Sequence, residues 1–212
     1  MDCSQCQGIE ELFNEETVSR NLVDYRRNGP DKVTRMLVNA LIAAGVKGKT
    51  LLDIGGGVGA IQHELLSAGV ENAIDVDASS AYIDAAKGEA GRRNLTDKIQ
   101  FMHGNFVDLS ASIPASDVVT LNRVICCYDD VVGLINSSAE RAKQLYALVY
   151  PHNAWWLKLG MKIMNFLFKF TDNPYRAFDH PTQAVENLIE KHDLHRIFYR
   201  RTLVWQVAVY SR

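Results

Sequence analysis

The chain has 212 residues, of which 47% are hydrophobic and 23% are charged. This length favours a single domain over residues 1–212, because a nucleotide-binding domain and a separate substrate domain would not both have enough room. The 23 basic and 25 acidic residues nearly balance, so the composition predicts neither disorder nor a polyanion-binding surface, and nucleic acid is not an expected partner.

The first residues carry no sign of export. Residues 1–6 lack the basic start and apolar run of a signal peptide, and no uncharged apolar stretch reaches membrane-spanning length. We therefore expect a cytoplasmic protein without an integral membrane segment. Cys3 and Cys6 have the spacing of a zinc or redox pair, but Cys126 and Cys127 are adjacent and make a poor second ligand pair. No metal site is predicted.

The N-terminal part of the chain is expected to be helical. Residues 8–44 have a helical pattern that breaks at residues 27–30, where Gly29 and Pro30 interrupt it. We expect residues 1–45 to form a helical cap.

Strand and helix patterns then alternate along the chain. The expected strands cover residues 50–54, 72–76, 99–103, 117–122 and 144–150, with helices at 59–68, 79–91 and 131–141. An apolar helical insertion at 153–171 and a helix at 181–192 follow. The last two strands, 194–201 and 204–211, are joined so closely that they must form an antiparallel hairpin. The prediction is an α/β fold of three layers, in which helices cover both faces of a seven-stranded, mostly parallel sheet.

A glycine-rich turn follows the first expected strand. Gly55, Gly56 and Gly57 allow the backbone to approach a ligand closely, and the next helix offers its amino end. Asp77 closes the second strand, where a carboxylate can accept hydrogen bonds from both ribose hydroxyls. Together these features predict an adenosine-binding site.

An NAD(P)-dependent oxidoreductase is an alternative, because Gly55, Gly57 and Ala60 also satisfy the looser dinucleotide pattern. Three features favour a methyl donor instead. Asp53, within the turn, suits an ammonium group better than a pyrophosphate; the terminal hairpin departs from an all-parallel sheet; and no second domain is present to position a hydride acceptor.

At these residues the chain resembles the class I, Rossmann-like, S-adenosylmethionine-dependent methyltransferases. Asp53, Gly55, Gly57, Gly59 and Asp77 match the family pattern in order, and the resemblance extends over residues 39–212. It implies S-adenosylmethionine as cofactor and S-adenosylhomocysteine as product.

The resemblance also implies the other cofactor contacts. Gly56 and Ala78 complete the turn and the end of the second strand. After the third strand, Asn105 replaces the usual acid beside the adenine amino group, and Phe106 is expected to stack on the ring. Asn122 and Arg123 are expected near the methionine moiety. Related enzymes fold an N-terminal segment over the cofactor, here the segment that contains Tyr25, Arg26, Arg27 and Thr34.

The acceptor is expected beyond the carboxyl ends of the strands. Because a sulfonium methyl is already activated, positioning and exclusion of water can supply most of the catalysis. For a hydroxyl acceptor, His152 or His180 could take the proton, with Tyr128 or Asp129 as an orienting partner. Whether oxygen, nitrogen, carbon or sulfur receives the methyl group stays open, and a cofactor-binding module without turnover is a second alternative.

The apolar segment from Trp155 to Phe170 has three interpretations. Lys158, Lys162, Asn165 and Lys169 share one stripe of a helical projection, and almost all other residues are apolar. The helix could wall a pocket for a small hydrophobic substrate, form a core or homodimer interface, or dock transiently on a membrane surface.

Overall fold

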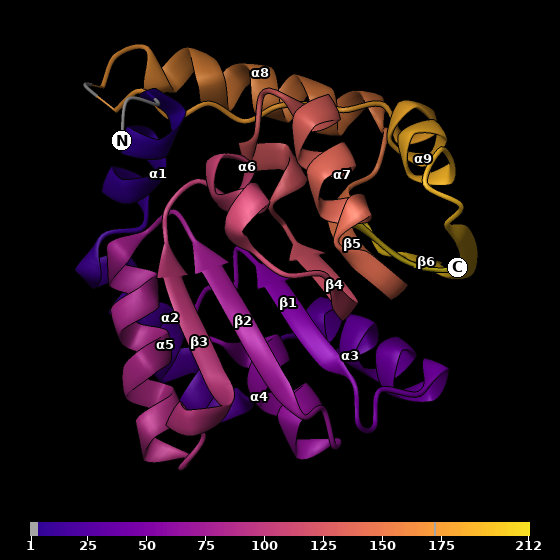
Figure 1. Cartoon of the computed structure of the whole chain (residues 1–212). Coiled ribbons are helices and arrows are strands. Elements are labelled where there is room, and N and C mark those ends of the chain that lie inside the picture. The colour runs from indigo at the N-terminus through magenta and orange to yellow at the C-terminus, as the bar shows by residue number, and fades with distance from the viewer. Residues whose placement is uncertain (1–3, 172) are drawn as a thin grey trace.

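The computed structural model describes residues 4–171 and 173–212, and a seven-stranded sheet lies at its centre (Figure 1). The strands are β1 (Thr50–Ile54), β2 (Asn72–Asp77), β3 (Ile99–His103), β4 (Ser116–Asn122), β5 (Ala142–Pro151), β6 (His195–Arg201) and β7 (Trp205–Ser211). Their order is β3-β2-β1-β4-β5-β7-β6. Neighbours among β1 to β5 pair in parallel, and β7 is antiparallel to both β5 and β6. The predicted sheet with its antiparallel terminal hairpin is confirmed.

Helices connect and cover these strands. The α-helices are α1 (Ser4–Leu12), α2 (Glu15–Asn28), α3 (Lys32–Ala44), α4 (Ala60–Ser67), α5 (Ser80–Arg92), α6 (Phe106–Leu109), α7 (Val131–Glu140), α8 (Trp155–Phe168) and α9 (Thr182–Glu190). Short 3-10 helices are η1 (Thr96–Lys98), η2 (Ser110–Ser112) and η3 (Ile125–Cys127).

The sheet separates two hydrophobic cores and so forms the middle of three layers. Leu51 and Leu52 are both fully buried on β1 but belong to different cores, because successive side chains of a strand point to opposite faces. Residues of α3, α4 and α5 pack on one face, and residues of α6, α7 and α9 pack on the other. These packed layers hold the strand ends in fixed positions.

The strand order brings the glycine-rich turn and Asp77 to one edge of the sheet. Ile54 at the end of β1 pairs with Val76 on one side and with Leu121 on the other. From β1 the sheet extends in both directions, to β2 and β3 on one side and to β4 and β5 on the other. Ligands of such sheets bind where the strand order changes direction, beyond the carboxyl ends of the strands.

The N-terminal region contains one more break than the sequence pattern predicted. The break at Gly29 and Pro30 is confirmed, but a second one separates α1 from α2 at Phe13 and Asn14. The Asn14 side chain accepts a hydrogen bond from the Thr17 backbone N–H at 3.1 Å and so caps α2. A polar residue that we had placed inside a continuous helix therefore starts a new one. The structure also contains the short helix α6, which we did not predict.

The insertion after β5 places α8 at the outside of the molecule, across the top of the view in Figure 1, above α6 and α7. Described residues between 169 and 181 form an extended strap that runs back along α8 to α9. None of the residues of α8 is buried. Within the described ranges, no helix has the length and apolarity needed to cross a bilayer.

Candidate functional site

The turn after β1 brings bare backbone to the edge of the sheet. Gly55 and Gly57 have φ angles of +68° and +58°, a region that side chains disfavour. A Cβ atom at Gly56 would collide with the Asp75 carboxylate and with Gln62. Glycine is therefore required at successive positions, and the turn exposes its backbone to any ligand above it.

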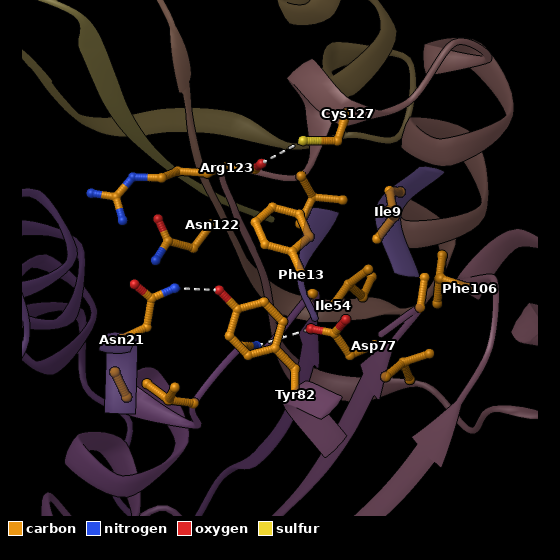
Figure 2. Close-up of a pocket in the computed structure, with 18 of the residues that line it drawn as sticks. Ile9, Phe13, Asn21, Ile54, Asp77, Tyr82, Phe106, Asn122, Arg123 and Cys127 are labelled. Carbon is orange, nitrogen blue, oxygen red and sulfur yellow. Dashed lines mark hydrogen bonds between the residues drawn. The ribbon is translucent and has the colours of Figure 1, made fainter. Parts of the chain in front are cut away.

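Asp77 is joined to this turn by direct hydrogen bonds. Its Oδ2 accepts from the Gly57 N–H at 3.0 Å (Figure 2). Its Oδ1 accepts from the Ser79 N–H at 2.9 Å. Burial raises the pKa of Asp77 to about 6, although these two backbone bonds lower it. The carboxylate is thus held rigidly beside the turn and retains free lone pairs for further donors.

Turn and carboxylate line one cavity of about 370 Å³, which falls in the size range of small-molecule sites. The walls come from the carboxyl ends of β1 to β4, from α1 and α2, and from the connection between α2 and α3. The cavity brings together most of the predicted residues: Gly55, Gly56, Gly57, Asp77, Ala78, Asn105, Phe106, Asn122, Arg123 and Tyr128. Asp53, His152 and His180 are not among its lining residues.

Asp53 lies beneath the turn instead. Its Oδ1 accepts a hydrogen bond from the Thr120 hydroxyl at 2.6 Å, and its Oδ2 accepts from Gln62 Nε2 at 3.3 Å. Burial raises the pKa of Asp53 to about 7. Burial and the neighbouring Asp53 and Asp77 also raise the pKa of Asp75 well above its usual range. Asp53 is therefore fully buried and bonded to Thr120 and Gln62, outside the cavity in which an ammonium group is expected.

The two histidines proposed as bases are held by backbone carbonyls away from the cavity. His152 Nε2 lies 2.6 Å from the carbonyl oxygen of Leu203, and His180 Nε2 lies 2.8 Å from that of Tyr128. Tyr128 does line the cavity, and its hydroxyl donates to Asn105 Oδ1 at 2.8 Å. No histidine occurs among the described lining residues, and no cluster of three metal-ligand side chains is found in the described chain.

Asn105 and Phe106 begin α6 at the cavity wall. Asn105 Oδ1 accepts from the Val107 N–H at 3.2 Å, which caps the helix, and its Nδ2 donates to Asp108. The amide oxygen that we expected beside adenine therefore already has two donors, Val107 and Tyr128. Phe106 is buried in the core and is also among the residues that line the cavity.

The connection between α2 and α3 closes the other side of the cavity. Asp31 caps α3 and forms a bidentate ion pair with Arg123 at 2.8 and 3.0 Å. Burial alone would raise the pKa of Asp31, but the bonds from Arg123 and Thr34 lower it to about 2. Asn122 Nδ2 donates to the Thr34 hydroxyl at 3.0 Å. These bonds hold the start of α3 against the end of β4. An N-terminal segment that folds over the cofactor would need such contacts.

Helix α1 supplies lining residues that the sequence analysis missed. Ile9 lines the cavity together with Phe13, whose ring lies 5.3 Å from that of Tyr82 (Figure 2). Gln5 holds α1 in place, because its Nε2 donates to the carbonyl oxygens of Cys127 and Arg176. Nothing in nine residues of α1 sequence indicated this docking, since the partners are more than a hundred residues away.

Comparisons with known proteins agree with this geometry. Residues 52–144 match the family described as methyltransferase domain. The structure superposes on magnesium protoporphyrin IX methyltransferase from Synechocystis PCC 6803 with bound SAH (TM-score 0.74, 17% identity, covering 98% of this chain and 99% of that one). It also superposes on an O-methyltransferase family protein from Burkholderia thailandensis (0.68, 18%, 94% and 63%). A further match is an O-methyltransferase family 2 protein from Planctomyces limnophilus in complex with apigenin (0.67, 15%, 93% and 61%). Among curated proteins, none matches the sequence significantly.

The resemblance to class I S-adenosylmethionine-dependent methyltransferases is therefore confirmed. The family match covers the segment that contains the glycine-rich turn and Asp77, and the structural matches extend the shared fold to nearly the whole chain.

Proposed function

We propose that the cavity binds S-adenosylmethionine and that the protein transfers its methyl group to a small, hydrophobic organic acceptor. The observation that carries this proposal is the direct link between the turn and Asp77, whose carboxylate stands where ribose hydroxyls could donate to it. Gly55, Gly56 and Gly57 would contact the amino-acid arm, with Asn122 and Arg123 beside it. Ala78, Asn105 and Phe106 would surround the adenine. Asp53 would act only through the turn.

The acceptor would occupy the part of the cavity under α1. Apolar side chains meet there, from Ile9 and Phe13 on the N-terminal segment to Val124 and Leu134 after β4. The structural similarity to an enzyme named for magnesium protoporphyrin IX and to an O-methyltransferase family 2 protein in complex with apigenin also supports a hydrophobic acceptor. The acceptor atom is left open by this chemistry.

The proposed mechanism relies on positioning rather than on a strong base. Bound S-adenosylmethionine supplies an activated methyl group for in-line displacement. Ile9 and Phe13 exclude water from the reacting atoms, and the ion pair between Asp31 and Arg123 keeps the N-terminal helices closed over them. Tyr128 is the lining residue nearest to a catalytic role, because its hydroxyl donates to Asn105 and so orients a residue expected beside the adenine.

Calorimetric titration with S-adenosylmethionine, S-adenosylhomocysteine and NAD tests the cofactor assignment. We expect both adenosyl compounds to bind and NAD not to bind, and binding of NAD alone would establish the oxidoreductase alternative. Incubation with methyl-labelled cofactor and an extract of apolar metabolites then tests turnover. A protein that retains the label and transfers none is a binding module, the second alternative.

A further inference from the structure

The outward face of α8 is apolar. Trp155, Leu159, Phe166 and Leu167 are 76, 50, 57 and 60% exposed, and Phe170, just beyond the helix, is 75% exposed. With 3.6 residues per turn these side chains occupy one continuous face. The opposite face contacts the strap: Asn165 exchanges two hydrogen bonds with the Ala177 backbone, and Phe168 lies edge-on to Tyr175. A soluble protein rarely presents such a face without a partner.

Positive charge borders this apolar face. Lys158, Lys162 and Lys169 lie in one stripe along its flank, and residues 155–171 contain no acidic residue. Lys162 and Lys169 are exposed, whereas Lys158 forms an ion pair with Asp179 at 3.1 Å. The surface is therefore complementary to an apolar partner that also carries negative charge.

The same surface continues past the start of α8 to the hairpin turn between β6 and β7. His152 joins the two parts, because its ring contacts Trp156 and its Nε2 lies against the Leu203 carbonyl. Leu203 itself is 77% exposed, and the two residues at the end of β6, Arg200 and Arg201, are exposed as well. Aromatic, aliphatic and basic groups thus extend beyond one helix.

We propose that the α8 surface, residues 155–170 with Leu203, docks on an anionic lipid bilayer. A helix with tryptophan, phenylalanine and leucine on one face and lysines along its flank can lie in the plane of the interface. Tryptophan rings suit the headgroup level, and each lysine gains from the negative surface potential. A second copy of this chain fits less well, because residues 155–171 offer no acidic side chain that could pair with the lysines of the other copy.

Docking would place the cavity near the lipid. The strap under α8 also contacts the cavity wall: the Tyr175 hydroxyl lies 3.2 Å from Cys127 Sγ, and Arg176 exchanges hydrogen bonds with Gln5 of α1. The α8 surface and the cavity therefore share the same end of the sheet. An apolar acceptor could pass from bilayer to cavity over a short distance, a step that rests on the proposed function, whereas the docking itself does not.

Vesicle sedimentation of the full chain tests the docking. We expect the wild type to sediment with vesicles of phosphatidylcholine and phosphatidylglycerol, and less with phosphatidylcholine alone. The double variant Leu159→Gln, Phe166→Gln removes apolar groups from the docking face and should weaken binding about tenfold or more. The double variant Lys162→Glu, Lys169→Glu should weaken binding to the anionic vesicles by about fivefold or more for each lysine reversed.

Matched controls make the same kinds of change, apolar to glutamine and lysine to glutamate, elsewhere on the surface. Val23→Gln with Val132→Gln alters exposed apolar residues of α2 and α7, and Lys87→Glu with Lys98→Glu alters exposed lysines near α5; neither pair should change sedimentation. Circular dichroism checks that every variant is folded. Cofactor titration without vesicles reports on the cavity separately, so failure of docking and failure of the proposed function are distinguishable. A wild type that sediments with neither vesicle would overturn the proposal, as would a wild-type dimer that the Leu159 and Phe166 changes split.

Discussion

Asp77 is the residue from which a pH dependence of cofactor binding should arise. Its ionised carboxylate can accept from ribose hydroxyls, and burial raises its pKa to about 6. Protonation removes acceptor capacity, so the affinity for S-adenosylmethionine should fall as the pH drops below about 6. If only the ionised form binds, the limit is about tenfold per pH unit. Calorimetry at a series of pH values on both sides of the pKa measures this slope.

The variant Asp77→Asn provides the control. It keeps the size of the side chain but loses the charge, and charged hydrogen bonds of this kind contribute roughly 1.5–3 kcal/mol each. We expect affinity to fall by about tenfold to a hundredfold and the pH dependence below 6 to disappear. A variant that binds as tightly as the wild type would show that Asp77 does not hold the ribose.

At the scale of elements, strands β1 and β2 each carry a buried aspartate, Asp53 and Asp75, and burial raises the pKa of both. Burial raises the pKa of Asp53 to about 7, whereas an unfolded aspartate titrates near 3.9. Between these pH values the folded state keeps a proton that the unfolded state has lost. The contribution of Asp53 to the free energy of unfolding should therefore fall as the pH rises from about 4 to about 7 and then level off.

Asp53→Asn should remove the Asp53 part of this dependence and leave the part that comes from Asp75 and Asp77, whose pKa values are also raised. A neutral amide avoids the cost of burying a charge, which at pH 8 is on the order of 2–4 kcal/mol. The amide can also donate to Gln62 Oε1, a buried acceptor without a partner among the described residues. Thermal unfolding of both proteins across this pH range measures the difference. Asp117→Asn is the contrasting control, because bonds from Thr50 lower the pKa of that carboxylate and its removal should destabilise the fold at neutral pH.

Helix α1 depends on a close approach at Gly8. A Cβ atom there would overlap the backbone of Tyr175, so Gly8→Ala should push α1 away from the strap and open the cavity. We expect faster proteolysis near the N-terminus and a cofactor affinity lowered by about fivefold, which corresponds to about 1 kcal/mol of lost contact energy.

Gly88→Ala, in α5, is the matched control for the Gly8→Ala substitution in α1. Gly88 lies in α5, and a Cβ atom there meets nothing within 4 Å. Replacing a helical glycine by alanine should raise stability by about 0.5–1 kcal/mol without changing cofactor affinity. If both substitutions behave alike, the packing of α1 on the strap does not control the cavity.

The helices and strands differ in how far the sequence predicted them. Strands β1 to β7 were predicted to within about two residues. Most of them are apolar runs bounded by polar or glycine residues, and the exposed strand β6 was found from its short connection to β7. The positions of Gly55, Gly57 and Asp77 at one edge followed from that order. Three contacts could not be predicted in this way. They are the docking of α1, the hydrogen bond from Tyr128 to Asn105 and the contact of His152 with the Leu203 carbonyl, and each joins residues distant in sequence. Local patterns carry no information about such contacts.

At the scale of the whole molecule, the cavity is assembled from segments that span most of the chain. The residues that line the cavity lie between Gln5 and Leu134 in the sequence. The strap at residues 173–178 does not line the cavity but forms hydrogen bonds with α1 and η3, which do. Phe178 N–H donates to the Cys126 carbonyl, for example, so a C-terminal segment supports the loop after β4. Closure of the cavity and folding of the chain should therefore be coupled.

This coupling predicts a single cooperative unfolding transition that the cofactor shifts upward. If residues 1–212 form one domain, circular dichroism and tryptophan fluorescence should report the same melting temperature, and the calorimetric and van't Hoff enthalpies should agree. S-adenosylmethionine at about a hundred times its Kd adds about 2.7 kcal/mol, which raises the melting temperature of a chain of this size by about 5–10 °C. A separate early transition that the cofactor leaves unmoved would instead mark the α8 region, which contains Trp155 and Trp156, as an independent unit. A variant lacking the ion pair, Arg123→Ala, should melt in one step but with a smaller shift, because the N-terminal helices then close less firmly over the bound cofactor.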